Sequence, residues 1–468
     1  MHYEKFQDGT VKCIEDEIPF ELPEGWAWAR LGTVAEAIGD GDHQPPPQTS
    51  SGIPFLVISN VSGGALSFEN TRFVSIEYFN RLPETRKPQN GDLLFTVTGS
   101  YGIPVLVDTD DMFCFQRHIA IVRPCTISNR YLYVILGSSY VKSICDAKAT
   151  GTAQKTVGLA TLRELLIPIA PHTEQMQIYA KTQNTLSIVD SISSDKEALL
   201  NIIKNTKAKI LNLAIRGQLV LQDPNDESAS VLLERIKAEK EALIKQGKIK
   251  RDKKESVIFK GDDNSYYEKI DGEVFCIDEE IPYDIPDTWT WMRLENCCIK
   301  EIRRGKSPKY TENSTVLVFA QKCNTKYNGI DVNLAQYLDE ATLKRYPSDE
   351  YMQDGDVVIN STGTGTLGRV GIYRNTDNTT GLSIVPDSHV TVIRSFSCIS
   401  SHYLYAFMKA HQSELEKKGE GSTNQKELKP LTLKEVLIAI PPLSEQKRID
   451  KSINTAFRRL AVIEESIS

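Results

Sequence analysis

Residues 8–31 read DGTVKCIEDEIPFELPEGWAWARL, and residues 271–294 read DGEVFCIDEEIPYDIPDTWTWMRL. The two tryptophans and the arginine that end the first stretch recur 263 positions later in the second. A further match, LLIPIAPHTEQMQI at 165–178 against VLIAIPPLSEQKRI at 436–449, closes each copy. Solenoid repeats have much shorter periods, about 20–50 residues. The duplication therefore predicts two copies of one globular unit, each followed by a helix.

The composition is that of an ordinary folded protein. The chain has 468 residues, of which 40% are hydrophobic and 25% charged, enough for two domains with connecting helices. No run approaches the roughly 18 apolar residues of a membrane-spanning helix, and the first residues lack the apolar core of a signal peptide. We therefore expect a cytoplasmic protein. The 9 cysteines form no CxxC pair, so neither a disulfide framework nor a metal site is expected.

The strand signals repeat between the copies. Short runs with β-branched residues, bounded by glycine, proline and asparagine, predict strands at 53–58, 92–97, 104–107 and 118–122 and again at 315–319, 356–360, 370–373 and 389–393. A helix is predicted to follow at 131–135 and at 403–407, and each WxWxRL segment predicts a short strand leading into a helix. The fold class is therefore α+β, with two tandem homologous units of mixed α and β structure.

A long helix is predicted after the first copy, because the segment from Thr173 to Ile215 contains no proline or glycine. Its apolar residues fall mostly at three- and four-residue spacing, which indicates a coiled-coil seam. The second copy ends in a similar stripe, so each helix is a candidate partner of the other; two unrelated surface helices are the alternative. The predicted seam comprises Ile178, Leu186, Val189, Ile192, Leu199, Ile203, Ile210, Ile449, Ile453, Leu460 and Ile463.

These signals predict five segments. They are a first domain (1–170), a long helix (171–216), a second helix with a basic linker (217–262), a second domain (263–442) and a shorter distal helix (443–468). The basic run at 248–254 is interpreted as a solvated linker rather than a nucleic-acid patch.

Motifs of self-contained chemistry are missing from the sequence. It has no GxxxxGK[ST] phosphate loop, no HExxH, no GxSxG and no [DN]PP[FY] tetrapeptide of adenine methyltransferases. Two glycine-rich turns, at 98–102 and 362–368, are not followed by a clear helix and are interpreted as tight turns. We therefore expect no catalytic residue in this chain.

The loops before the first strand differ between the copies while the scaffold repeats, which is the pattern expected if recognition lies on loops. The second copy gathers basic and aromatic residues that are candidate DNA contacts, with a solvated surface loop as the alternative. Its candidates are Arg303, Arg304, Lys306, Lys309, Tyr310, Lys322, Asn324, Lys326, Tyr327, Thr364, Arg369, Asn424, Gln425 and Lys426. The first copy is poorer in charge, and its candidates are His43, Gln44, Gln48, Asn60, Arg72, Thr98, Ser100, Tyr101, Arg117, His118, Gln154 and Lys155.

These motifs, in this order, resemble the specificity subunit of a type I restriction-modification enzyme. The resemblance covers nearly the whole chain: the two-tryptophan segment, the Gly-Asp strand with its glycine-rich turn, the G(T/S)xxQK segment, the PPLSEQ helix start and the central GQLVLQDPNDE stretch. It implies two target recognition domains held apart by an antiparallel helix pair in a pseudo-twofold arrangement. Each domain would read one half of a bipartite site in double-stranded DNA.

The resemblance also implies partners and their cofactors. Two methyltransferase subunits would bind this chain, and restriction subunits would join through the complex. S-adenosylmethionine, ATP and magnesium would belong to those subunits, and none to this chain. The net charge of −7 then has a physical account, because a protein that grips DNA alone is usually basic and here the partners would supply most phosphate contacts.

One departure and several alternatives accompany this interpretation. The second copy reaches residue 468, the equivalent of residue 197, so its helix is predicted to be shorter than the first. The alternatives are a specificity subunit of a related, type II-like restriction-methylation complex, a stand-alone DNA methyltransferase with degenerate motifs, and a coiled-coil scaffold without nucleic acid. The last would leave the divergent loops unexplained.

Overall fold

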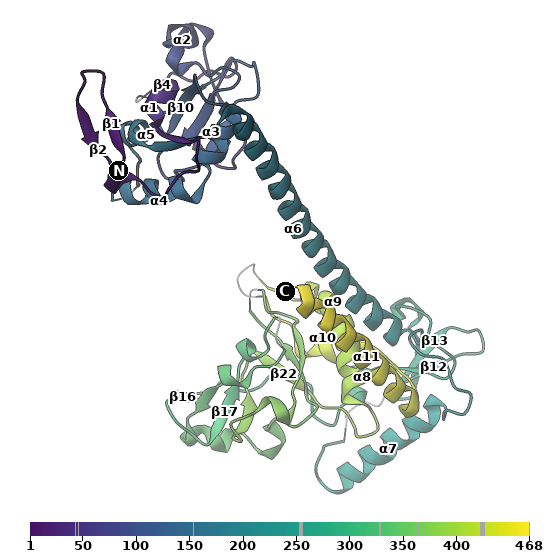
Figure 1. Ribbon diagram of the computed structural model, residues 1–468. Helices are drawn as coiled ribbons and strands as arrows, with labels where there is room; N and C mark the ends of the chain where they lie inside the picture. The colour runs from purple at the N-terminus through teal and green to yellow at the C-terminus, as the bar shows by residue number, and fades with distance from the viewer. Residues whose placement is uncertain are drawn as a thin grey trace. The chain divides into compact units, whose positions relative to one another are not determined.

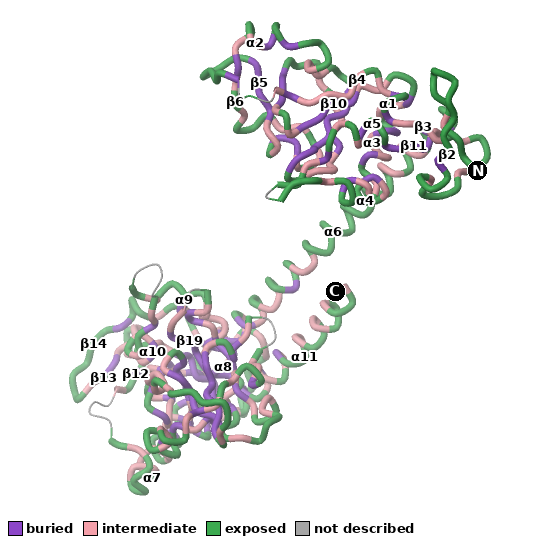
Figure 2. Tube along the Cα trace, turned by 90° about the vertical axis from the view of Figure 1, so that its left-hand side faces the viewer, coloured by how far each residue is buried: buried purple, intermediate pink, exposed green. Residues whose placement is uncertain are grey.

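The chain forms two compact units, residues 1–194 and 195–468. The computed structural model in Figure 1 describes residues 1–42, 44, 46–152, 154–251, 256–326, 329–363, 365–421 and 426–467. Within these residues no helix is long and apolar enough to cross a membrane. Both units mix helices with sheets, as the sequence predicts, and each encloses its own buried core (Figure 2).

The first unit contains a four-stranded sheet in the order β4-β10-β7-β8, a three-stranded sheet β6-β5-β9, the pair β11-β3 and the hairpin β1-β2. Its strands are β1 (Tyr3–Lys5), β2 (Val11–Cys13), β3 (Ala27–Arg30), β4 (Ala35–Asp40), β5 (Ile53–Leu56), β6 (Arg72–Val74), β7 (Leu93–Thr96), β8 (Pro104–Leu106), β9 (Cys114–Phe115), β10 (Ile119–Pro124) and β11 (Leu166–Ile169). Its helices are α1 (Leu31–Val34), α2 (Ile76–Arg81), α3 (Asn129–Leu136), α4 (Ser139–Lys148), α5 (Leu159–Glu164) and the first part of α6 (His172–Ile215).

The second unit repeats this plan with sheets β20-β19-β22, β16-β18-β17-β21, β15-β23 and β12-β13-β14. Its strands are β12 (Ser256–Lys260), β13 (Tyr266–Ile270), β14 (Glu273–Cys276), β15 (Thr290–Arg293), β16 (Tyr310–Thr311), β17 (Val316–Phe319), β18 (Gln336–Leu338), β19 (Val357–Asn360), β20 (Val370–Ile372), β21 (Ser383–Pro386), β22 (Val390–Ile393) and β23 (Leu437–Ile440). Its helices are α7 (Ala229–Lys245), α8 (Ser401–Ala410), α9 (Gln412–Lys417), α10 (Pro430–Lys434) and α11 (Leu443–Ile467).

The predicted strands are confirmed to within a few residues, and the two-tryptophan segments form β3 and β15 as predicted. Each pairs antiparallel with the strand just before a long helix, β11 or β23. The second small sheet of each unit was not predicted. It contains a parallel pair, β5 with β9 in the first unit and β17 with β21 in the second, whose partners lie far apart in sequence.

The repeated motifs form the start of each long helix. Trp26 donates its indole N–H to Glu174 Oε2 at 2.9 Å, and Trp289 donates to Glu445 Oε2 at 2.9 Å. A carboxylate in the first turn also interacts favourably with the positive end of a helix dipole. The next residue, Gln175, accepts from the Ser128 amide and donates to the Ala170 carbonyl. Its equivalent in the second unit, Gln446, accepts from the Ser400 amide and donates to the Pro441 carbonyl. The Glu-Gln pair therefore anchors the first turn of each long helix to the unit that precedes it.

The arginine of each two-tryptophan segment is also structural. Arg293 pairs with Glu268 at 2.6 Å and with Glu280 at 2.8 Å, and it donates to the backbone carbonyl of Glu435. Arg30 makes the same three kinds of contact in the first unit. These contacts tie the preceding hairpin to β3 or β15 in both copies.

The end of α6 packs against α11 inside the second unit. Lys207 Nζ lies 2.6 Å from Glu464 near the end of α11, whereas Gln222, just beyond α6, donates to Glu445 at the start of α11. The two helices therefore run antiparallel here. Ile449 and Ile453 are buried in the same apolar cluster as Leu211 and Ala214 of α6.

The prediction of one continuous seam along α6 is wrong in the middle of the helix. Leu186, Val189 and Ile192 are 50%, 52% and 62% exposed. The reason is length: α6 has 44 residues and α11 has 25, and the shorter helix covers only the last part of the longer one. The remaining predicted seam residues differ in burial. Ile178 packs against the core of the first unit, and Ile203 is buried. Leu199, Ile210 and Leu460 are half-buried, and Ile463 is exposed.

Candidate nucleic-acid interface

Four segments of the first unit meet at one end of its larger sheet. The loop after β4 bridges the turn before β10 through Asp42 and Gln116, and the glycine-rich turn after β7 bridges the segment before α5 through Thr98 and Thr156. The backbones cross closely at Gly41, where an added Cβ would lie 2.0 Å from the Phe115 carbonyl oxygen. We call this junction the turn cluster of the first unit. It consists of the loop after β4 at Asp42, the turn before β10 at Gln116, the glycine-rich turn after β7 at Thr98 and the segment before α5 at Thr156.

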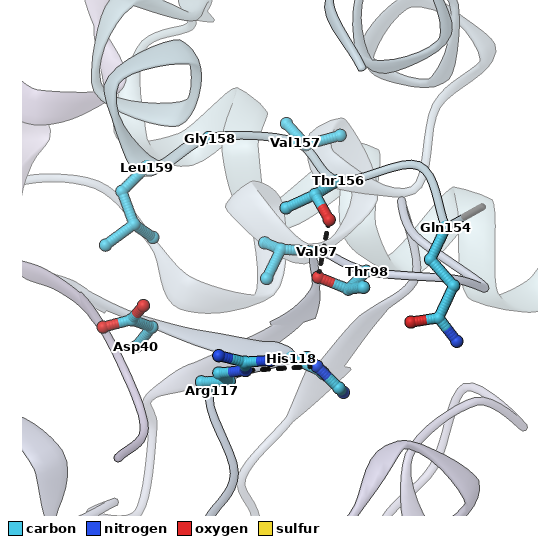
Figure 3. A pocket seen from close by; sticks show the side chains of 10 residues that line it. All are labelled: Asp40, Val97, Thr98, Arg117, His118, Gln154, Thr156, Val157, Gly158 and Leu159. Atoms are coloured by element: carbon cyan, nitrogen blue, oxygen red, sulfur yellow. Dashed lines mark hydrogen bonds between the residues drawn. The ribbon is translucent and has the colours of Figure 1, made fainter. Parts of the chain in front are cut away.

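The turn cluster surrounds a cavity of about 340 Å³. Figure 3 shows Asp40, Arg117 and His118 on one side of this cavity and Thr98 and Thr156 on the other, the last two joined by a hydrogen bond of 3.1 Å between their hydroxyls. Of the sequence-predicted DNA contacts, the structure therefore brings four together here, and they are Thr98, Arg117, His118 and Gln154.

The cation of this cluster is Arg117, because its neighbour His118 stays neutral. Burial lowers the pKa of His118, and the adjacent guanidinium lowers it further. The exposed Arg117 donates Nε–H to His118 Nε2 at 3.4 Å. At pH 7 the cluster therefore offers the Arg117 guanidinium and the Asp40 carboxylate together with uncharged hydrogen-bonding groups, namely imidazole, hydroxyl and amide. Groups of this kind read base edges and phosphates.

The second unit builds an equivalent turn cluster from its own four segments. Lys306 bridges Asp387, and Thr362 bridges Glu427, at the positions that Asp42–Gln116 and Thr98–Thr156 hold in the first unit. Arg304 pairs with Glu427 at 3.1 Å, and the Thr362 hydroxyl lies 2.6 Å from His389 Nδ1. The backbone geometry of the cluster is thus repeated.

The chemistry of the two clusters differs at equivalent positions. Asp40 of the first unit corresponds to Arg304 of the second, and Thr156 corresponds to Glu427. Arg117, which carries the positive charge of the first cluster, corresponds to Ser388. One backbone scaffold therefore presents different charges at the same places, which is the arrangement required to recognise two different targets.

Arg303 and Lys306 have internal partners, which the sequence did not indicate. The side chain of Glu350 is only 2% exposed, and three cations surround it: Lys300 Nζ at 3.0 Å, Arg303 at 2.5 Å and Lys306 at 3.8 Å. Lys306 also donates to the Arg345 carbonyl. Because a buried carboxylate needs a compensating cation, Arg303 contributes to the stability of the loop rather than to base reading.

Asn60 and Asn324 are buried, so the prediction that these two amides face DNA is wrong, whereas Arg369 is half-buried and bonded to nearby loops. The Asn60 amide is buried, donates to two backbone carbonyls and accepts from the Val57 N–H. Asn324 is buried and donates to Asn360 and to the Arg369 carbonyl. Arg369 in turn donates to the carbonyls of Asn324 and Gly365. These groups hold loops in place.

The other predicted contacts lie around the clusters rather than in them. Tyr101 is held by Asp146, to which its hydroxyl donates at 2.8 Å, and by Lys142, 4.0 Å from the ring centroid. Lys309 pairs with Asp339 at 3.0 Å. The exposed remainder comprises Gln44, Gln48, Arg72, Ser100, Lys155, Tyr310, Lys322, Lys326 and Lys426. His43, Tyr327, Thr364, Asn424 and Gln425 lie outside the described residues.

Sequence reasoning missed Asp40, Thr156, Ser388 and Glu427. Asp40 lies in the loop that differs between the copies but was not among its predicted contacts, and the other three residues lie outside that loop. Aligning the two copies through their isolated β-bridges shows that Asp40 and Arg304, Thr156 and Glu427, and Arg117 and Ser388 are equivalent positions. Among the described residues, no group of three or more His, Cys, Asp or Glu side chains is arranged to hold a metal ion.

Two units of one fold that present different side chains on matching turns define a two-domain recognition protein. Residues 23–202 and 286–467 both match the family model of the type I restriction modification DNA specificity domain. The chain belongs to this family.

Relatives and solved structures agree with the family match. The chain is 24% identical to the type I restriction enzyme EcoEI specificity subunit of Escherichia coli, over 97% of this chain and 81% of that protein. It is 27% identical to the EcoAI specificity subunit of Escherichia coli, over 62% and 54%. Its fold is similar to that of the HsdS subunit from Thermoanaerobacter tengcongensis, with a TM-score of 0.55, 18% identity and coverage of 96% and 93%. A chain from a study of complex assembly and conformational transition of the type I R-M system gives a TM-score of 0.62 at 18% identity, with coverage of 96% and 94%.

Proposed function

We propose that this chain is the DNA-recognition subunit of a type I restriction-modification complex, non-catalytic by itself, and that each unit reads one half of a bipartite double-stranded DNA target through its turn cluster. The observation that carries the proposal is that equivalent positions of the two clusters carry different charges on a repeated backbone. Asp40 corresponds to Arg304, and Arg117 corresponds to Ser388. A repeated scaffold with different contact groups reads two different sequences.

The side chains assigned to base reading are those that are accessible at each cluster. In the first unit they are Arg117, His118 and Gln154, with Thr98 and Thr156 forming the wall of the cavity. In the second unit they are Arg304 and His389, with the exposed Lys426 next to Glu427. A guanidinium recognises guanine through two parallel hydrogen bonds, and a glutamine amide recognises adenine in the same way. The surrounding exposed lysines are assigned to phosphates, which fix position without reading sequence.

The methyltransferase subunits are assigned to the exposed middle of α6. Residues 184–198 are exposed on every side of the helix, including Leu186, Ile188, Val189 and Ile192. Apolar side chains clustered on an exposed surface mark protein interaction sites. In this proposal S-adenosylmethionine, ATP and magnesium are bound by the partner subunits, and this chain supplies sequence recognition.

Replacing Arg304 with alanine tests the assignment in the second unit. We expect specific DNA binding by the assembled methyltransferase complex to weaken by about 1–3 kcal/mol if Arg304 reads a base, with the loss confined to one half-site. The side chain of the partner that remains, Glu427, is 42% exposed, so stability should change by less than about 0.5 kcal/mol. The measurement is a binding titration on DNA that carries the motif methylated in the host.

Two further variants complete this test. Arg303→Ala should instead lower stability, because Glu350 is buried, and Arg235→Ala on α7 serves as a control for loss of an exposed charge. A phosphate contact at Arg304 would flatten the slope of log K against log salt by about 0.9 rather than relax specificity. Unchanged affinity and slope in Arg304→Ala would remove this cluster from the DNA interface.

A further inference from the structure

The two units differ in what covers their two-tryptophan segments. In the second unit this surface is covered by described residues of 216–251 and 256–260, from the end of α6, from α7 and from β12. The Arg216 guanidinium lies 4.4 Å from the Tyr283 ring centroid. An added Cβ at Gly217 would lie 2.4 Å from Pro286. The glycine is therefore required by the close approach of this turn to the segment.

Further described residues of this segment also contact the surface. Gln222 donates to Glu445 at 2.6 Å and accepts from the Thr288 hydroxyl at 3.0 Å. Leu232 and Ile236 of α7 and Ile258 of β12 are buried in one cluster with both tryptophans of this copy. Finally β12 pairs antiparallel with the outer edge of β13 from Ser256 to Lys260.

In the part of the chain that the structure describes, the first unit has the same surface without a covering segment. Among the described residues β1, the counterpart of β13, pairs only with β2. Phe20, the counterpart of Tyr283, is 46% exposed, and Glu174 is exposed where Glu445 is completely buried. The hydrogen bond from Trp26 to Glu174 nevertheless has the same 2.9 Å length as its counterpart. The surface is therefore already formed.

The charges of surface and cover are complementary. Residues 1–31 contain seven acidic and three basic side chains, a balance of −4. Residues 216–260 contain eleven basic and eight acidic side chains, a balance of +3. Charge complementarity favours encounter and correct register between two polypeptides.

We propose that this face of the first unit, formed by the outer edge of β1 with Phe20, Pro23, Trp26 and Glu174, is a docking platform for a segment of another polypeptide with the chemistry of residues 216–260. The occupant carries an Arg-Gly turn for Pro23 and Trp26, a glutamine for Glu174, an amphipathic helix and a strand that extends the β1–β2 hairpin. Strand addition to an exposed edge supplies affinity through backbone hydrogen bonds and specificity through alternate side chains. The inference does not depend on DNA recognition.

The test uses the full chain and a fluorescently labelled peptide of residues 216–260. We expect saturable binding, followed by fluorescence anisotropy, with one peptide per chain and hydrogen-exchange protection at residues 2–6 and 20–28. A peptide with Leu232→Asp and Ile236→Asp is the matched control and should not bind, because the change removes the apolar face of the helix.

Two variants of the chain locate the site. The amides of Phe6 and Ile14 bond across the hairpin, so the alternate residues Tyr3 and Lys5 direct their N–H groups outward. Lys5→Pro should therefore block strand addition while keeping the hairpin, and Glu174→Ala should remove the glutamine partner. Each should weaken binding by about tenfold or more, as loss of one or more hydrogen bonds in a buried contact does. Binding that is absent, is equal for the control peptide, persists in both variants, or protects residues 256–291 instead would overturn the proposal.

Discussion

Arg394→Ala is expected to lower the free energy of unfolding of the second unit by about 3–5 kcal/mol, because it leaves a buried carboxylate without its cation. The side chain of Asp356 is 0% exposed and accepts two hydrogen bonds from Arg394, both 2.7 Å long. It also accepts a hydrogen bond from the Gln353 amide at 2.8 Å. The measurement is urea unfolding, with hydrogen exchange resolved by mass spectrometry to assign the loss to residues 195–468.

The pH dependence of this variant is a second readout. Burial raises the pKa of Asp356, and Arg394 lowers it. A carboxyl whose folded-state pKa lies above the unfolded value of 3.8 loses stability as pH rises between the two values. Removing Arg394 raises the folded-state pKa further, so the deficit should shrink as pH falls toward the acid range.

Two comparisons control for the loss of an arginine as such. Adding Asp356→Asn to Arg394→Ala should recover part of the stability, because the buried charge is then gone. Arg235→Ala removes an exposed pair and should change stability by less than about 1 kcal/mol. Equal effects of Arg394→Ala and Arg235→Ala would show that the buried pair does not support the unit.

Gly41→Ala should abolish recognition of one half of the DNA target while the unit stays folded. The added Cβ would lie 2.0 Å from the Phe115 carbonyl oxygen and 2.5 Å from the Gln116 carbonyl carbon, both backbone atoms that cannot rotate away. The loop must therefore move off the strand turn that carries Arg117. Loss of two base contacts, at about 1–3 kcal/mol each, weakens specific binding by about 30-fold or more.

The second unit contains an equivalent glycine that tests the same prediction, and the first unit contains a glycine that serves as a control. At Gly305 the added Cβ would lie 2.3 Å from the Asp387 carbonyl oxygen and 2.4 Å from that of Pro386, so Gly305→Ala should affect the other half-site. Gly63 has no atom within 4 Å of its Cβ position, and Gly63→Ala should bind normally. The readout is binding to DNA with either half-site altered. If Gly41→Ala binds as Gly63→Ala does, the turn cluster does not hold the recognition loop.

The sequence predicted the repeat, the main strands and the long helix because these depend on local patterns. The strand 92–97 and its counterpart 356–360 are apolar runs beginning at Gly-Asp, and both form central strands, β7 and β19. The Glu-Gln pair at each helix start was visible as a repeat, but its hydrogen bonds to Trp26 and Ser128 depend on contacts across more than forty residues. Such contacts leave no local signal.

The candidate site was only partly predictable for the same reason. A loop rich in arginine and lysine indicates a basic surface, but nothing in the sequence shows that Glu350, some fifty residues away, lies buried between Lys300 and Arg303. Asn60 was a plausible base-reading amide until its partners were known to be backbone groups of its own loop. The length difference between α6 and α11 was predicted from the sequence. Its consequence, that the middle of α6 is exposed, is evident only from how the two helices pack in the structure.

Exchange of residues 26–165 for the corresponding region of a relative tests the central claim most directly. This segment contains the whole turn cluster of the first unit and leaves that of the second unit intact. The methylated motif would be read by sequencing host DNA before and after the exchange, with the methyltransferase subunits present. We expect one half of the bipartite motif to change and the other half to stay the same. A change in both halves, or in neither from an exchanged chain that still supports methylation, would contradict the account.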